Sequence, residues 1–143
     1  MSEADRAILR RQLVRDEGVR LKPYLDTIAH ITIGVGRNLS ANGITHEEAQ
    51  LMLEHDIDQC EKQMRFLLPW AEKLDPVRYR VLMNMGFNLG IEGLLAFKNM
   101  LACLKVGEYT SAALNMLDSR WAEQVGARAT RLAEAMRTGV ELP

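Results

Sequence analysis

The sequence is poor in the residues that metal and redox sites need. Its two cysteines, Cys60 and Cys103, lie far apart in apolar helical patterns and match neither a metal-binding spacing nor a redox motif. We therefore expect both to be buried free thiols. The three histidines, His30, His46 and His55, also lack a ligand spacing. The sequence thus predicts no metal site.

Long apolar segments are absent as well. No stretch approaches the roughly 20 apolar residues that a membrane-spanning helix requires. The first residues, MSEADRAILRRQLV, mix charges throughout and lack the unbroken apolar segment of a secretory signal. We expect such a chain to accumulate in the cytoplasm, so a target outside the membrane must be reached by another route.

The chain has no marked excess of charge of either sign. Its formal net charge of -1 argues against a protein that neutralises nucleic-acid phosphates. The apolar fraction of 48% and the charged fraction of 26% are ordinary for soluble globular proteins, and 143 residues suit one domain. The sequence therefore predicts a compact soluble domain that does not bind nucleic acid, and nothing in it demands more than a monomer.

The hydrophobic periodicity predicts a small β-hairpin region followed by a mostly helical body. A first helix is expected over Glu3–Glu17, with Gly18 as its stop signal. Apolar residues then alternate with small ones over residues 31–36, as in a half-buried strand with one open face. The capping box Thr45–Glu48 predicts the start of a second helix. Asp75-Pro76 predicts the start of a third, which breaks near Gly90 and Gly93. Three shorter helices are expected over Phe97–Val106, Thr110–Leu117 and Gly126–Arg137. The expected class is α+β, predominantly α-helical.

Two acidic residues and a threonine form the candidate site for chemistry. Glu17 ends the first helix, Asp26 lies beside the next turn, and Thr32 projects from the open strand face with Gly34 and Gly36, which leave room for a substrate. A glycosidic bond is cleaved by one carboxylic acid and one carboxylate in different environments. We expect Glu17 to be the shielded proton donor and Asp26 the wetter, ionised partner. On spacing alone, however, pairing of both acids with arginines is the more frequent case.

Five ordered segments indicate a family. DEGVRLKPYLDT with TIGVGR resembles the bacteriophage endolysin lysozymes of glycoside hydrolase family 24, and GITHEEAQLML, NMGFNLG, FKNML and SRWAEQVGARA resemble later family segments in the same order. The resemblance covers nearly the whole chain. It implies one lysozyme-like domain over residues 1–143, with two lobes that flank a cleft. The hairpin lobe is expected at about 18–45, and the helical body at about 46–143 with the N-terminal helix packed on it.

The resemblance also implies an activity, the hydrolysis of the β-1,4 bond between N-acetylmuramic acid and N-acetylglucosamine in peptidoglycan. Glu17 matches the general acid of the family, Asp26 its second carboxylate and Thr32 its water-orienting hydroxyl. The family resembles inverting enzymes, in which Asp26 would act as a base through water. No metal or organic cofactor is implied.

Further positions are implied to bind the saccharide. Phe87 and Asn115 match residues that line the cleft of the family, and Asn88 occupies the position of a related amide. Arg128 matches an arginine that approaches the catalytic glutamate. Because a cation favours the charged carboxylate, we expect substrate binding to desolvate Glu17 and loosen this pairing.

Three positions depart from the family pattern. Arg37 and Asn38 replace histidine and leucine, and Met100 replaces a small polar residue. The link between TIGVGR and GIT is short, so the upper wall of the cleft should be small. These cleft contacts are not transferred, and Arg37 has no assigned role.

The implied biological role is that of a phage or prophage endolysin. Its binding partner would be the glycan strands of peptidoglycan. The protein would remain in the host cytoplasm until a holin-like membrane permeabiliser gives it access to the cell wall. Three alternatives remain: a hydrolase of related amino-sugar polymers, a lytic transglycosylase that uses Glu17 alone, and a glycan-binding or structural phage component without turnover.

Overall fold

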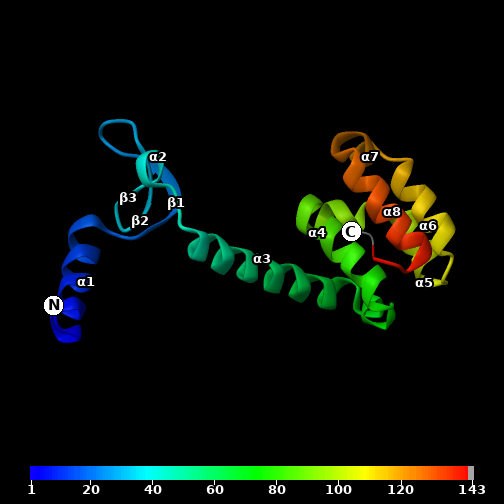
Figure 1. Ribbon diagram of the computed structural model, residues 1–143, viewed down its shortest axis with the longest axis horizontal. Helices are drawn as coiled ribbons and strands as arrows, with labels where there is room; N and C mark the ends of the chain where they lie inside the picture. The colour runs from blue at the N-terminus through cyan, green and yellow to red at the C-terminus, as the bar shows by residue number, and fades with distance from the viewer. Residues whose placement is uncertain (142–143) are drawn as a thin grey trace. The chain divides into compact units, whose positions relative to one another are not determined.

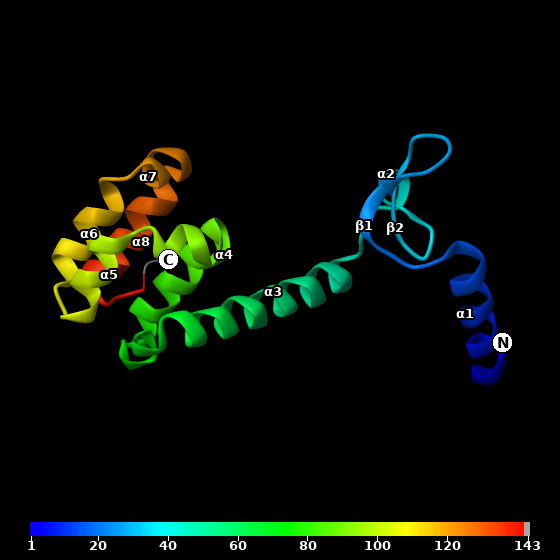
Figure 2. The ribbon, with the colours of Figure 1, turned by 180° about the vertical axis from the view of Figure 1, so that it is seen from behind.

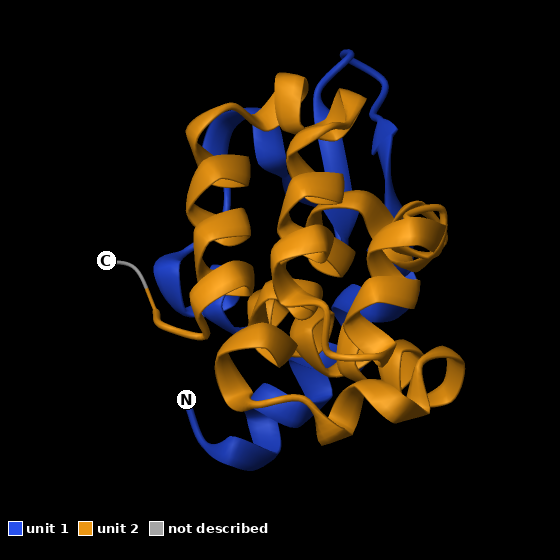
Figure 3. Cartoon of the chain, turned by 90° about the vertical axis from the view of Figure 1, so that its right-hand side faces the viewer, with its two compact units in different colours: residues 1–51 blue, residues 52–143 orange. Residues whose placement is uncertain are grey.

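A computed structural model describes residues 1–141 of the chain (Figure 1). These residues form eight α-helices, one 3-10 helix and a three-stranded antiparallel sheet, so the predicted α+β class is confirmed. They divide into two compact units, one over residues 1–51 and one from Met52 onward, which Figure 3 shows in blue and orange. Each unit is described by itself.

The N-terminal unit contains one long helix and the sheet. Its elements are α1 (Glu3–Glu17), β1 (Arg20–Leu25), β2 (Ile31–Gly34), β3 (Arg37–Asn38), α2 (Leu39–Asn42) and the first residues of α3 (His46–Leu67). Ser2 caps α1 by accepting a hydrogen bond from the main-chain N–H of Asp5, and Gly18 ends the helix at a φ of 75°. Both ends of the predicted first helix are confirmed.

The central strand of the sheet is β2, with β1 on one side and β3 on the other. Thr32 pairs with Tyr24 of β1 and with Asn38 of β3. The register between β1 and β2 shifts between Arg20 and Tyr24. Thr32 therefore lies at a position that both neighbouring strands flank.

A capping box starts α3, as predicted. The hydroxyl of Thr45 accepts a hydrogen bond from the Glu48 N–H, and the Glu48 carboxylate accepts one from the Thr45 N–H. The same carboxylate pairs with the guanidinium of Arg37 on β3. The main-chain hydrogen bond from Thr45, together with that from Arg37, lowers the pKa of Glu48. Arg37, which had no assigned role, thus links β3 to the start of α3.

The second unit is helical. After the remainder of α3 it comprises the 3-10 helix η1 (Pro69–Lys73), α4 (Pro76–Leu95), α5 (Lys98–Lys105), α6 (Tyr109–Leu117), α7 (Arg120–Val125) and α8 (Ala127–Thr138). The helices predicted over Phe97–Val106, Thr110–Leu117 and Gly126–Arg137 correspond to α5, α6 and α8. Figure 2 shows α6 beside α5 and α8.

Helix α4 begins as the sequence predicts and bends where it predicts a break. Asp75 caps its first turn, Pro76 occupies the first helical position, and Gly90 leaves the helical conformation at a φ of 74° and a ψ of 160°. The predicted break near Gly90 is confirmed, but Gly93 makes no second break, because the helix resumes after Gly90 and continues to Leu95.

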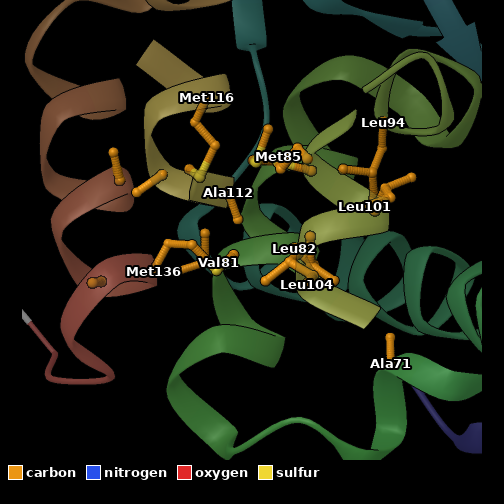
Figure 4. Packing of buried hydrophobic residues seen from close by; sticks show 14 of the residues in the cluster. Ala71, Val81, Leu82, Met85, Leu94, Leu101, Leu104, Ala112, Met116 and Met136 are labelled. Atoms are coloured by element: carbon orange, nitrogen blue, oxygen red, sulfur yellow. The ribbon is translucent and has the colours of Figure 1, made fainter. Parts of the chain in front are cut away.

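Leucine and methionine side chains fill the core of the second unit (Figure 4). The largest fully buried side chains are Met64, Leu82, Met85, Leu94, Met100, Leu104, Met116 and Met136. Methionine adapts to irregular gaps, and small residues of α6 and α8 such as Ala112 and Ala133 permit close helix packing. This core is the scaffold for the helical residues discussed below.

Within residues 1–141, no single helix is both long and apolar enough to cross a membrane. The pair formed by α4 and α5 has the length and composition, but its two helices are bent by 101°.

Candidate functional site

Glu17 is the last residue of α1, and its carboxylate lies against a glycine of the hairpin. Gly36, in the turn between β2 and β3, has a φ of 68°, and a Cβ atom placed on it would lie 2.7 Å from Glu17 Oε2. The carboxylate therefore occupies the space that a side chain at position 36 would need. We had expected Gly36 to leave room for substrate, and that expectation is wrong. Gly34 keeps open space, with no atom within 4 Å of its own Cβ position.

Asp26 closes the turn between β1 and β2. Its Oδ1 accepts hydrogen bonds from the main-chain N–H groups of Ile28 and His30, at 3.0 and 2.8 Å. Its own N–H donates to the His30 carbonyl at 2.9 Å. Ala29, between them, adopts a left-handed φ of 65°. The turn thus holds the Asp26 carboxylate in a defined orientation.

The expected difference in burial between the two acids is reversed within this unit. The Glu17 side chain is exposed, and the Asp26 side chain is 29% exposed. The reason is local: the chain turns away directly after Glu17 at Gly18, whereas the main chain of the turn surrounds Asp26. Burial therefore does not distinguish the acid from the base, and their roles rest on the resemblance.

Thr32 is buried, with 4% of its surface exposed. Its hydroxyl donates a hydrogen bond to the His30 carbonyl at 3.2 Å. The alternation over residues 31–36 places Thr32 on the open face and the apolar residues on the covered face, yet the apolar Ile31 is 47% exposed. The reason is the central position of Thr32 between two strands, with α2 packed against β2.

The structure brings Asp26 and Thr32 together through His30. Both side chains make hydrogen bonds to the main chain of this residue. The His30 imidazole lies beside the Asp26 carboxylate, at 3.7 Å from Nδ1 to Oδ2, and Nδ1 lies 2.9 Å from Asn38 Nδ2. The sequence analysis considered His30 only as a metal ligand and rejected it. It did not predict the contacts of His30 with Asp26, Thr32 and Asn38. The available signal was its place four residues after Asp26 in the same turn.

In the second unit, Phe87 and Arg128 line one cavity of about 590 Å³. The Arg128 guanidinium donates to Asn84 Oδ1 at 2.7 and 3.0 Å and to the Asn84 carbonyl at 3.3 Å. The Tyr79 side chain also lines this cavity, and its hydroxyl has no partner among the described residues. Burial raises the pKa of Tyr79. The expected approach of Arg128 to the glutamate stays a prediction.

Asn88 and Asn115 do not line that cavity. Asn88 Oδ1 accepts a hydrogen bond from the indole N–H of Trp121 at 2.9 Å. Asn115 donates to the Ser111 carbonyl at 2.8 Å and borders a separate cavity of about 450 Å³, together with Met100. Of the four predicted saccharide-binding residues, the structure therefore brings together only Phe87 and Arg128.

Within residues 1–141, no three His, Cys, Asp or Glu side chains are arranged to hold a metal ion. Both cysteines are free thiols. Cys60 is buried, as expected, and burial raises the pKa of its thiol. Cys103 is only partly buried, so the expectation of two buried thiols is half confirmed.

The phage lysozyme family matches residues 14–137, which include the whole hairpin and nearly all of the helical unit. The chain belongs to the phage lysozyme family. It is 30% identical over 155 residues to the pre-baseplate central spike protein of Enterobacteria phage T4, covering 89% of this chain and 27% of that protein. It is 31% identical over 110 residues to an endolysin of Salmonella phage P22, covering 71% and 73%.

A third relative is matched over nearly its whole length. It is named "Probable T4-type lysozyme 1", from Dictyostelium discoideum, and is 26% identical over 160 residues, covering 92% of this chain and 94% of that protein. The family and these names support a lysozyme, an enzyme of the glycoside hydrolase class. They also support the predicted lysozyme-like character of the α+β fold.

Proposed function

We propose that this lysozyme is a muramidase that hydrolyses the β-1,4 bond between N-acetylmuramic acid and N-acetylglucosamine in peptidoglycan. One observation carries the proposal. In a chain of the phage lysozyme family, Gly36 accommodates the Glu17 carboxylate, and Asp26 and Thr32 are both tied to His30. Three groups of the kinds that glycoside hydrolysis uses thus belong to one compact unit.

Each group has a distinct role in the proposed reaction. Glu17 protonates the glycosidic oxygen as the bond to the sugar breaks. Asp26 accepts a proton from the water that attacks the anomeric carbon from the opposite face, which inverts the configuration. Thr32 donates its own proton to the His30 carbonyl, so its oxygen lone pairs remain to accept a hydrogen bond from that water.

Peptidoglycan digestion tests this proposal. We expect the unaltered protein to release reducing ends from purified peptidoglycan, and Glu17→Gln to release almost none at the same folded concentration, because an amide cannot donate the required proton. Failure of the unaltered protein to cleave peptidoglycan over a range of salt and pH would overturn the muramidase proposal and favour a glycan-binding phage component.

The products separate the enzymatic alternatives. Inversion predicts that the first product seen by proton NMR is the α-anomer, since the bond cleaved is β. A lytic transglycosylase would instead leave an anhydro-sugar and would retain activity in Asp26→Ala. Cleavage of chitin oligosaccharides in preference to peptidoglycan would indicate a hydrolase of related amino-sugar polymers.

We also propose that the chain acts as a phage endolysin. The endolysin of Salmonella phage P22 supports this role, and the T4 spike protein supports the alternative of a lysozyme carried within a phage particle. An endolysin produced in bacteria would wait in the cytoplasm and lyse them only when a holin-like protein permeabilises the inner membrane. Lysis without such a partner would contradict this dependence.

One lysozyme-like domain, acting as a monomer on glycan strands, completes the proposal. We expect a single cooperative unfolding transition and a monomer mass in sedimentation equilibrium. Two separate transitions would indicate that the units fold independently.

A further inference from the structure

We propose that His30 and Asn38 are positioning residues for Asp26, and that they keep one oxygen of its carboxylate free for the attacking water. This inference rests on the proposed function, in which Asp26 is the base. It arises from a series of contacts that runs from the N-terminus of α2 through Asn38 and the His30 ring to the Asp26 carboxylate. Its first link fixes the orientation of the Asn38 amide.

Asn38 is the N-cap residue of α2. Its Oδ1 accepts a hydrogen bond from the main-chain N–H of Ala41 at 3.0 Å. Because Oδ1 is committed to the helix, the amide must direct Nδ2, which can only donate, toward the imidazole of His30. Nδ2 lies 2.9 Å from His30 Nδ1.

This geometry favours one tautomer of the imidazole. A nitrogen that accepts a hydrogen bond carries no proton, so the contact with Asn38 favours the tautomer with its proton on Nε2. Nδ1 then lies 3.7 Å from Asp26 Oδ2 and has no proton to donate to it. Because Oδ1 already accepts two main-chain N–H groups, Oδ2 is the oxygen that can take a proton from water.

Protonation of His30 would remove this arrangement. A second N–H, on Nδ1, would point at the Asn38 amide protons and would be repelled by them. It would be attracted instead to Asp26 Oδ2, only a small movement away, and would form an ion pair with it. The base would then be occupied, so the cleavage rate should fall as His30 becomes charged.

Two charged side chains of the neighbouring strands have partners of their own, whereas Lys22 of β1 makes no ion pair within residues 1–141. On β3, Arg37 pairs with Glu48, and on β1 the Arg20 guanidinium lies over the Tyr24 ring at 4.0 Å. The residues of α2, Leu39–Asn42, include no ionisable side chain. Asp26 is the carboxylate that lies beside the His30 ring, at 3.7 Å from Nδ1.

NMR tests the first part of the inference without any measurement of activity. Long-range correlations between the ring nitrogens and carbons report the tautomer of each histidine, and His30→Gln identifies the signals of His30. We expect the Nε2–H tautomer in the unaltered protein near pH 7.5. A proton on Nδ1 at that pH would overturn the proposal.

The pH dependence of kcat tests the second part, with solubilised peptidoglycan fragments as substrate. Glutamine can still accept from Asn38 through its amide oxygen but does not titrate. We expect kcat to fall less steeply with decreasing pH in His30→Gln than in the unaltered protein, because glutamine cannot gain the proton that would occupy Asp26.

Asn38→Asp provides a matched variant. Aspartate caps α2 as well as asparagine does, but it accepts rather than donates, and so it stabilises the protonated imidazole. The fall in kcat with decreasing pH should begin at higher pH in this variant. The proposed role would be overturned if His30→Gln and the unaltered protein showed the same pH dependence of kcat, or if Asn38→Asp left that dependence unchanged. Full activity of Glu17→Gln would overturn the proposed function instead. The NMR measurement of the His30 tautomer would still test the contact between Asn38 and His30.

Discussion

The carboxylate of Glu17 lies against the α-carbon of Gly36. A Cβ atom at position 36 would meet Oε2 at 2.7 Å and Cδ at 3.1 Å, distances that real Cβ atoms rarely tolerate. Because Gly36 has no side chain, the Glu17 carboxylate at the end of α1 can lie directly against the main chain of the turn between β2 and β3. This contact makes Gly36 a positioning residue for the proposed acid.

Gly36→Ala should therefore reduce activity strongly while the protein remains folded. The added methyl group must displace the Glu17 carboxylate, and a displacement of about 1 Å in a reacting group can cost on the order of 100-fold in rate. We expect a loss of this size in kcat, measured by release of reducing ends, with a smaller change in KM.

Gly43→Ala is the control for backbone strain. Gly43 also has a left-handed φ, of 57°, but no atom lies within 4 Å of its Cβ position. Both alanine variants should lose about 1–2 kcal/mol of stability, since both hold an L-residue in the left-handed region. Equal losses of kcat in the two variants would show that strain, and not the contact with Glu17, accounts for the effect.

Thr32→Val should lower kcat and change the free energy of unfolding little. Valine has nearly the same shape but lacks the oxygen that is proposed to hold the attacking water. The His30 carbonyl keeps its hydrogen bond from the Asp26 N–H, so the turn should persist. We expect kcat to fall on the order of 10- to 100-fold. Thr32→Ser, which restores the hydroxyl, should recover most of it, and equal activity of the two variants would exclude the proposed role.

The elements that the sequence predicted correctly are those with local signals. Gly18 ends the first helix, Thr45 and Glu48 form the capping box, and Asp75-Pro76 starts α4. Each of these signals lies within a few residues of the boundary that it defines, so a single sequence contains the information.

Contacts between distant residues account for the errors. The space beside Gly36 is filled by a residue 19 positions earlier, and Thr32 is buried because two strands and α2 surround β2. The hydrogen bond between Asn88 and Trp121, which no local pattern indicates, also crosses 33 positions. Alternation along one strand shows that two faces differ, but not which face the rest of the chain covers.

Lowering the pH should weaken the helical unit through Asp75. Partial burial alone would raise the pKa of Asp75, but hydrogen bonds from the guanidinium and main-chain N–H of Arg78 outweigh it and lower the pKa. The unfolded chain then binds a proton more readily than the folded one. This contribution to stability is complete above the ordinary aspartate value of about 3.9 and is lost as the pH falls through the lower folded value.

Urea unfolding between pH 3 and pH 7 measures this effect. Asp75→Asn retains an N-cap oxygen but not the charge, so its free energy of unfolding should depend less on pH than that of the unaltered protein. Arg78 also donates to the carbonyls of Met136 and Arg137, which ties α4 to the end of α8. Parallel curves for the two proteins would show that the carboxylate charge adds nothing.

Asn88→Ala should destabilise the second unit, because it leaves the indole N–H of Trp121 without its partner. Trp121 is 4% exposed and contacts Phe97 edge to face, with ring centroids 6.0 Å apart. An unsatisfied buried donor costs about 1–3 kcal/mol, and thermal or urea unfolding should show a loss of this size.

A role for Asn88 in saccharide binding makes a different prediction for the same variant. If its main contact were with the sugar, Asn88→Ala would raise KM and leave the free energy of unfolding unchanged. Asn88→Gln retains an amide oxygen on a longer side chain and should recover much of the stability if Trp121 is the partner that matters. Trp121→Phe, which removes the donor, should make stability insensitive to the change at position 88, since the two effects are coupled through one hydrogen bond.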